Sequence, residues 1–445
     1  MNKNSRLILS IAFTVLVIGG AIAWKMSGTS VAETVRNWMI QTASRSLNGS
    51  LSVGEVDFSF SGSLVAKQVL LKDKTGALVA SAKTLAVDFD ISDLLSRRFD
   101  VSRVRNVKVD ELVLNLDRNK EKIWNASTVL KSTGAKASSP APASIFRGKV
   151  VATNSTVTIT TPETRYVFNN LEGTLDFAKY PEIAMDLKSK QGASVLAAKG
   201  AWNFSAGGNV AITAESIEPS AFSLMTHLKG LTTVQAVLAG TTDKPTARGS
   251  FKIPAGNLGT LTFSNASGDF TFADNILHLV NAKANALGGA IQANGSIYPD
   301  TLRYVQKVSG QNIDSSQLSD KDIQGRLDFN SDVQGQGDWD GASADGTFNM
   351  GSGRISGISF DSLTGNFSKR GVNIRYYNLT AKIAGQTIYI GDADSLNSLK
   401  LFFSQPTLPG LPGIPGFPGT PAAPSAPRAP TTPGIPKLPS LPKLF

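Results

Sequence analysis

The sequence predicts a mainly β protein. It would begin with a transmembrane helix and a short amphipathic helix, continue as an elongated, twisted antiparallel sheet built from repeats, and end in a proline-rich tail. Three observations predict this fold. Apolar and polar residues alternate along short segments from residue 55 onward, which is typical of strands with one dry and one wet face. Two 31-residue segments align without a gap at an offset of 97 residues. From residue 145 to about 393, short strands recur between Gly, Asn and Asp turns, with few segments that fit a helix.

The composition argues against several classes of function. The chain has 445 residues, a net charge of +10 from 44 basic and 34 acidic side chains, no cysteine and two histidines. Without cysteine there are no disulfides, thiolate metal sites or cysteine nucleophiles, and neither His227 nor His278 has a paired carboxylate or serine at a recognisable spacing. The basic residues form no dense stripe. We therefore expect no catalytic residues, cofactor, metal site or nucleic-acid partner, and the aspartates between 320 and 345 read as turn residues because no calcium-loop frame is present.

Residues 1–30 are predicted to form a cytoplasmic tip and a membrane anchor. Leu7–Trp24 is a stretch of 18 uncharged residues that follows Lys3 and Arg6 and precedes Lys25. About 20 apolar residues span a bilayer core, so this stretch just suffices, and the positive N-terminal side is expected to stay in the cytoplasm. The bulk of the chain would then be translocated. The alternative is a cleaved signal peptide with Ala21–Ala23 as the cleavage motif.

Residues 31–135 are predicted to hold a helix followed by the first β region. Val31–Leu47 has apolar residues at i, i+4 spacing and ends before Asn48-Gly49, which indicates an amphipathic helix with a glycine stop. After it, apolar residues alternate along three segments, so the members of each group share one face of a strand. These residues are Val56, Phe58 and Phe60; Leu85, Val87 and Phe89; and Leu112, Leu114 and Leu116.

Residues 136–144 are small, polar and proline-containing, which is typical of a linker, and residues 145–393 are predicted to form the repeated β region. Within that region only Ser220–Lys229 and Ser315–Asp322 fit short helices. Residues 394–445 are assigned to a disordered or polyproline II-like tail.

An internal repeat of about 95–97 residues organises the second region. Residues 263–293 align with 360–390, and a fainter copy lies 95 residues upstream of the first. A unit of a few strands cannot bury its own apolar face, so neighbouring units are expected to stack into one array. The chain offers few amphipathic helices to cover that face. Curling into an open trough and closing into a sandwich or barrel are both compatible with the pattern.

The C-terminal tail has a proline at every third position from Pro406 to Pro442, 13 in all. Polyproline II has three residues per turn, so these prolines would lie along one edge of a rod. The rod would serve as a spacer or would dock toward an outer-membrane or cell-wall partner; the alternative is plain low-complexity disorder.

The order of these features resembles the AsmA-like family of bridge-like lipid-transfer proteins of the bacterial envelope. The resemblance is carried by residues 47–95, with Gly-x-Leu and Val-x-Leu-x-Asp-like phrases, by residues 104–130, and by VSGQNIDSSQL at 308–318. It implies a periplasmic sheet curled into an apolar groove and anchored by a single pass in the inner membrane, with the N-terminus cytoplasmic. It also implies that the protein binds phospholipids and helps move them between the inner and outer membranes, in support of outer-membrane homeostasis.

On this hypothesis the nine alternating residues named above line the groove, although ordinary core packing is the alternative for each of them. Four arginines are candidates for contact with anionic headgroups, with a solvated edge strand as the alternative. They are Arg97, Arg98, Arg103 and Arg105. The alternative function is a non-enzymatic envelope scaffold or outer-membrane protein assembly factor that holds partners with its sheet edges and its proline tail.

Overall fold

A computed structural model of the chain describes residues 33, 36, 37, 40 and 41, and residues 47–404 except for the gaps listed next. The gaps are 60–61, 89–103, 122, 130–144, 163–164, 204, 220–227, 242, 318–321 and 338–340. The predicted anchor Leu7–Trp24, the linker 136–144 and the proline-rich stretch from Pro406 lie outside the described residues. No helix within the described ranges is long and apolar enough to cross a bilayer.

Helices are few and short in the described part of the chain. The described residues of the predicted first helix, which are 33, 36, 37, 40 and 41, have helical backbone. The other helices are α4 (Asn125–Thr128), the 3₁₀ helix η4 (Ser315–Gln317) and α5 (Leu396–Phe403). Thus a helical turn begins where the sequence predicts one at Ser315. The predicted helix 220–229 is wrong at its end, because Leu228–Lys229 is a strand, β12.

Helix α5 was not expected, because its residues fall in the segment assigned to the tail. Ser395 caps its N-terminus: the Ser395 Oγ accepts a hydrogen bond from the Ser398 N–H at 3.2 Å. Leu399 and Phe403 point from one side of the helix into the core, where both are buried. The helix ends at Phe403, before the first proline of the tail at Pro406. The proline spacing on which the tail was predicted therefore carries no information about the helix.

The chain divides into two compact units, which we describe separately. Unit 1 comprises residues 1–217, 232–250 and 272–274, and unit 2 comprises 218–231, 251–271 and 275–445. Strands β14 (Pro245–Leu258) and β15 (Leu261–Ala273) contribute residues to both. The strands that lie wholly in unit 1 are β1 (Ser50–Ser52), β2 (Glu55–Ser59), β3 (Ser63–Lys72), β4 (Leu78–Asp88), β5 (Asn106–Asp110), β6 (Val113–Asp117), β7 (Lys149–Thr160), β8 (Arg165–Asp176), β9 (Glu182–Gln191), β10 (Ser194–Asn203), β11 (Gly207–Ile217) and β13 (Thr232–Gly240).

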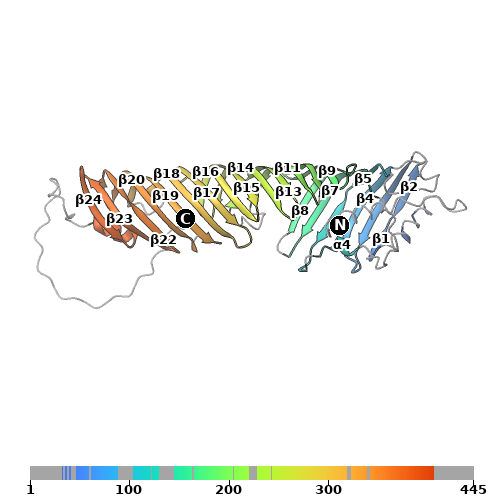
Figure 1. Cartoon of the computed structure of the whole chain (residues 1–445), viewed down its shortest axis with the longest axis horizontal. Helices are drawn as coiled ribbons and strands as arrows, with labels where there is room; N and C mark the ends of the chain where they lie inside the picture. The colour runs from blue at the N-terminus through green and yellow to red at the C-terminus, as the bar shows by residue number, and fades with distance from the viewer. Residues whose placement is uncertain are drawn as a thin grey trace, which may run out of the picture. The chain divides into compact units, whose positions relative to one another are not determined.

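In unit 1 the strand pairings are antiparallel except for two. Strand β3 pairs with β1, β2 and β4, and β4 pairs with both β5 and β6. From β7 the order β7–β8–β9–β10–β11–β13 follows the chain (Figure 1). However, β5 and β6 both pair with β7 in parallel, which the wholly antiparallel prediction missed. A parallel pair requires a long crossover, and residues 118–148 supply it. The strands on either side of the predicted linker are therefore direct neighbours.

In unit 2 the strands lie side by side in chain order (Figure 1). Each of β16 to β20 pairs with the next in an antiparallel manner, and β22, β23 and β24 continue the series from β20. The strands are β12, β16 (Ile276–Ala286), β17 (Gly289–Tyr298), β18 (Arg303–Asp314), β19 (Ile323–Gln336), β20 (Ser343–Ile355), β21 (Ile358–Phe360), β22 (Ser362–Arg370), β23 (Asn373–Ile383) and β24 (Gln386–Ala393). The prediction of a mainly β, many-stranded sheet is confirmed.

The strand bounds confirm the predicted repeat. Strands β16 and β23 are offset by 97 residues at both ends, and β10 and β17 by 95 residues at both ends. The backbone repeats as well: Asn281 and Asn378 are both left-handed, with φ of 52° and 55°. The hairpins after β16 and β23 use the equivalent pairs Leu287-Gly288 and Ala384-Gly385, all with positive φ. The glycine and phenylalanine matches in the sequence therefore mark equivalent places in the fold.

Left-handed asparagines sit at bulges in the strands of unit 2. The Asn281 N–H donates to the Asn294 Oδ1 at 2.6 Å, and the Asn312 N–H donates to the Asp328 Oδ1 at 2.7 Å. The strand register shifts beside both residues. A bulge bends its strand and increases the local twist, and asparagine tolerates the left-handed conformation better than most residues. These positions explain how the repeated strands are bent.

Each unit has a buried cluster on one face of its sheet, with a short helix at its side. In unit 1, Leu64, Val87 and Val107 are fully buried, and Ala126 of α4 belongs to the same cluster. In unit 2, Leu379 of β23 and Phe403 of α5 are fully buried in one cluster. These clusters form where helices meet the sheet.

Candidate functional site

The two faces of the sheet in unit 2 differ sharply in chemistry, as β19 shows. Ile323, Phe329 and Val333 are buried on one face, whereas Gln324, Asp328 and their alternate neighbours are exposed on the other. Because the side-chain period of a strand is two, this alternation separates an apolar face from a polar face along the whole strand. The same division continues across β16 to β18.

On β16–β18 the side chains of the apolar face are partly open to solvent. We call five of them the half-buried patch: Leu277, Ile291, Ile297, Tyr304 and Val308. Ile297 lies directly between Leu277 and Tyr304 on its two neighbouring strands. All five have intermediate exposure, in contrast to the fully buried cluster beside α5. The patch is therefore uncharged and reachable from solvent.

The polar face carries ion pairs between neighbouring strands. Lys307 Nζ lies 3.8 Å from Asp332, and Arg370 Nη2 lies 2.8 Å from Asp345. The hydrogen bond from Arg370 is the main reason that the pKa of Asp345 lies below its usual value. Since Asp328, Asp332 and Asp345 lie within strands, their prediction as turn residues is wrong. Each such exposed ion pair contributes at most about 1 kcal/mol to the stability of the fold. These pairs mainly favour the observed alignment of neighbouring strands.

A hollow of about 440 Å³ lies over these same strands. Most of its lining side chains belong to the polar face, among them Asn294, Lys307, Asn330 and Asp332. Amides and charges dominate this lining, so the hollow suits water or a polar ligand and not a hydrocarbon chain.

Three of the nine predicted groove residues are brought together in the closed cluster of unit 1. Val56, Leu85 and Val87 are at most 4% exposed. They share one face, because Ala66 of β3 pairs with both Val56 and Leu85, and Leu64 of the same strand pairs with Val87. A side chain that water does not reach is also closed to an acyl chain in this conformation.

The predicted groove residues on the third segment are more exposed to solvent than Val56, Leu85 and Val87. Leu112, Leu114 and Leu116 have intermediate exposure, and the first and last pack against the buried cluster. Phe58 lies in β2 opposite Leu64, but its side chain lies outside the described part, as do Phe60 and Phe89 altogether.

Of the predicted headgroup arginines, Arg97, Arg98 and Arg103 lie outside the described residues. Arg105 is exposed, and its backbone joins two strands: its N–H donates to the Asp88 carbonyl at 2.9 Å, and its carbonyl accepts from the Lys149 N–H at 2.8 Å. Arg105 thus lies immediately before β5, which begins at Asn106.

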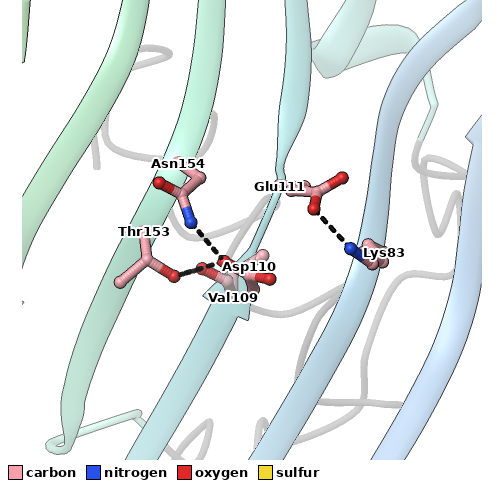
Figure 2. A network of polar contacts seen from close by, with 6 residues as sticks. All are labelled: Lys83, Val109, Asp110, Glu111, Thr153 and Asn154. Atoms are coloured by element: carbon pink, nitrogen blue, oxygen red, sulfur yellow. Dashed lines mark hydrogen bonds and ion pairs between the residues drawn. The ribbon is translucent and has the colours of Figure 1, made fainter.

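A network of polar side chains connects β7 to the two residues that separate β5 from β6, Glu111 and Leu112 (Figure 2). The Thr153 hydroxyl donates to the Asp110 Oδ1 at 2.7 Å, and the Asn154 side-chain amide donates to the same oxygen at 3.2 Å. Lys83 forms an ion pair with Glu111. The Thr153 hydrogen bond is the main reason that the pKa of Asp110 lies below its usual value. Glu111 and Asn154 are both left-handed, with φ of 49° and 47°. The network holds paired bulges in register.

Two polar side chains lie on the apolar face of unit 2 near α5. Lys369 is 6% exposed, and its Nζ donates to the Ala342 carbonyl at 3.2 Å. Burial raises the pKa of Tyr376 to about 12, so its phenol stays neutral at physiological pH. His278 contacts the Ser296 hydroxyl at 2.9 Å on the polar face. Among the described residues no group of acidic, histidine or cysteine side chains is arranged to hold a metal ion.

Sequence reasoning missed the half-buried patch. It placed the predicted lining on strands before residue 117 and assigned no lining residue to β16–β18. The signal was present as alternation along residues 276–298, where apolar residues such as Leu277, Leu279 and Ile297 fall on one face. The repeat drew attention to glycine and phenylalanine, and these aliphatic positions were passed over.

Comparisons with protein-family models, with curated proteins and with solved structures found no match to this chain. The resemblance of residues 47–95, 104–130 and 308–318 to the AsmA-like family therefore rests on the sequence motifs alone.

Proposed function

We propose that this protein binds phospholipid acyl chains along the apolar face of its sheet and helps move phospholipids between the inner and outer membranes. In this proposal Leu7–Trp24 anchors it in the inner membrane and the sheet lies in the periplasm. The observation that supports the proposal most directly is the half-buried patch, which is uncharged and open to solvent. Leu277, Ile297 and Tyr304 join it across three neighbouring strands, and on β18 the side chain of Gln306 lies between Tyr304 and Val308. That the apolar face curls into a groove around the acyl chains is also part of what we propose.

The physical reason for such a face is the cost of exposing hydrocarbon to water. Burial of one CH₂ is worth about 0.8 kcal/mol, so two 16-carbon chains would cost roughly 25 kcal/mol to expose. A succession of apolar side chains on strands about 4.8 Å apart offers a long ligand continuous contact. The headgroup would stay in water, and no residue needs to change its protonation state.

The polarity of the two faces favours a lipid over other occupants of the patch. Charged side chains gather on the opposite face, where Lys307 and Arg370 are already paired with aspartates. The patch itself offers aliphatic side chains and one tyrosine. A linear hydrocarbon complements such a surface better than a polar or charged partner does.

The predicted groove residues of unit 1 differ in whether a lipid could reach them. Val56, Leu85 and Val87 would not contact lipid in this conformation, because they are buried against each other's strands. Leu112, Leu114 and Leu116 remain candidates for contact with acyl chains, since each is partly exposed. The four arginines remain candidates for headgroup contact.

Site-specific photocrosslinking in intact membranes tests the proposal. A photoreactive side chain at Ile297 or Val308 is expected to capture phospholipid, because both positions lie on the apolar face. Ser296 and Ser309 are the matched controls: each is the chain neighbour of a test position, has similar exposure and faces the other side of the sheet. These two are expected to capture none.

Three outcomes would count against lipid binding. These are equal lipid capture at all four positions, no lipid capture at any of them, and capture of protein by Ile297 and Val308. The last outcome would favour the scaffold function, in which the sheet holds protein partners.

A further inference from the structure

A row of uncharged polar side chains crosses the polar face of unit 2. Its members lie on the neighbouring strands β17, β18, β19, β20, β22 and β23, and each is the register partner of the next. They are Gln292, Ser309, Asn330, Thr347, Asn366 and Tyr377, which we call the amide–hydroxyl row. Asn330 stands two residues from Asp332 on β19, so the row lies on the polar face. Because neighbouring strands lie about 4.8 Å apart, the row is about 24 Å long.

The side chains of the row make no hydrogen bond to one another or to any other described residue. Other polar side chains on this face are engaged with the backbone. The Asn294 Oδ1 accepts from the Asn281 N–H, and the Asp328 Oδ1 accepts from the Asn312 N–H, so both hold bulges. The row has no such role in the described part of the fold, and all of its side chains reach solvent.

The hollow of about 440 Å³ lies over the middle of this row. The charged side chains beside it are already paired: Lys307 with Asp332, and Asp345 with Arg370. These two pairs sum to zero charge, so an ion gains little by entering the hollow. The members of the row that line it are Ser309, Asn330 and Thr347.

We propose that the amide–hydroxyl row is a binding site for a neutral glycan chain that lies across the strands. A side-chain amide both donates and accepts hydrogen bonds, and so does a hydroxyl, which matches the hydroxyls that a sugar chain carries along its whole length. The strand spacing of about 4.8 Å is comparable to the length of one sugar unit in an extended chain. Successive units therefore meet successive members of the row. A hydrocarbon would leave these polar groups without partners.

This site is separate from the proposed lipid-binding surface, because it occupies the opposite face of the same strands. Ile291 of the half-buried patch and Gln292 of the row are consecutive residues of β17, so their side chains point to opposite faces. The competing explanation is a polar face that only interacts with water. It predicts that oligosaccharides do not bind and that substitutions in the row have no effect on such binding.

Calorimetric titration of the full-length protein, in a detergent without a sugar headgroup, tests the proposal. The two probes are hexasaccharides of β-1,4-linked glucose and of β-1,4-linked N-acetylglucosamine, and at least one is expected to bind the wild type. Which of them binds shows whether hydroxyls suffice or an N-acetyl group is needed. Asn330→Ala is expected to weaken that binding about tenfold or more, equivalent to about 1.4 kcal/mol, because Asn330 lies in the hollow.

Gln334→Ala is the matched control. Gln334 lies on the same strand and the same face as Asn330 and is likewise exposed, but it is not part of the hollow. Its substitution is expected to leave the affinity unchanged. If Asn330→Ala does not fold, Thr347→Val removes one hydroxyl of the row at nearly constant shape and is expected to weaken binding as well.

Three results would overturn the glycan site. These are no binding of either hexasaccharide to the wild type, unchanged affinity in a folded variant of Asn330 or Thr347, and an equal loss of affinity in Gln334→Ala. Failure of the lipid-capture experiment at Ile297 and Val308 would leave this site standing, because the titration contains no lipid probe and concerns the other face.

Discussion

Phe403→Ala is expected to destabilise unit 2 by about 3–5 kcal/mol, the range measured for deleting a large aromatic side chain from a core. Phe403 has no exposed surface, and its ring centroid lies 5.6 Å from that of Phe402 and 6.3 Å from that of Phe360. It is the residue through which α5 inserts into the cluster on the apolar face. Removing it leaves a cavity between the helix and the sheet and is expected to detach α5.

Amide hydrogen exchange of the full-length protein measures this effect locally, without requiring two-state unfolding. Amides of β23 and β24 are expected to lose protection in Phe403→Ala. Leu401→Ala is the matched control on the same helix, because Leu401 is 69% exposed and its truncation is expected to change stability by no more than about 0.5 kcal/mol. Equal loss of protection in the two variants would show that α5 does not pack as described.

Gly200→Ala is expected to disrupt the pairing of β10 with β11 and to lower the free energy of unfolding by about 3 kcal/mol or more. Gly200 has φ of 155°, a conformation that residues with a Cβ rarely adopt, and forcing one into it costs about 1–3 kcal/mol. The added Cβ would also meet the Asn209 carbonyl oxygen and would lie 2.8 Å from the Val210 Cα. The strands must separate to admit it, and each lost ladder hydrogen bond costs about 1 kcal/mol more.

The repeat supplies a second, independent form of this prediction. Gly295 is the counterpart of Gly200 at an offset of 95 residues, with φ of 158° and a carbonyl oxygen, that of Val305, in the same place. Gly295→Ala should therefore reduce the melting temperature to a similar extent, whereas Gly351→Ala should leave it unchanged, because no atom lies within 4 Å of an added Cβ there. Tolerance of alanine at both 200 and 295 would contradict the described strand geometry.

The parts of the fold that the sequence predicted are those encoded by local periodicity. Alternation identified strands, and the spacing of Gly and Phe identified the repeat, because a glycine opposite a ring or at a positive φ is required at equivalent places. The parallel pairing of β5 and β6 with β7 was not predictable in this way. The segment that joins β6 to β7, residues 118–148, has no sequence pattern that indicates a crossover to a parallel strand. Helix α5 was missed because its eight residues lie against a far stronger proline pattern.

The candidate site was only partly predictable for a related reason. Val87 and Ile297 both follow the alternating pattern, yet Val87 is fully buried and Ile297 is half-buried. Alternation tells which face a side chain joins, but its exposure depends on what packs over that face. Neither the helix that covers one part of the sheet nor the absence of such cover elsewhere among the described residues can be read from the strand itself.

Native mass spectrometry of the full-length protein released from mild detergent measures bound lipid most directly. We expect phospholipid adducts on the wild type that are lost from the folded double variant Ile297→Arg/Val308→Arg, because a cation in the patch opposes contact with hydrocarbon. Lipid held only by the proposed anchor at Leu7–Trp24 would persist in both proteins. Identical adducts on the two proteins, or none on either, would contradict the claim that the apolar face is the lipid-binding surface.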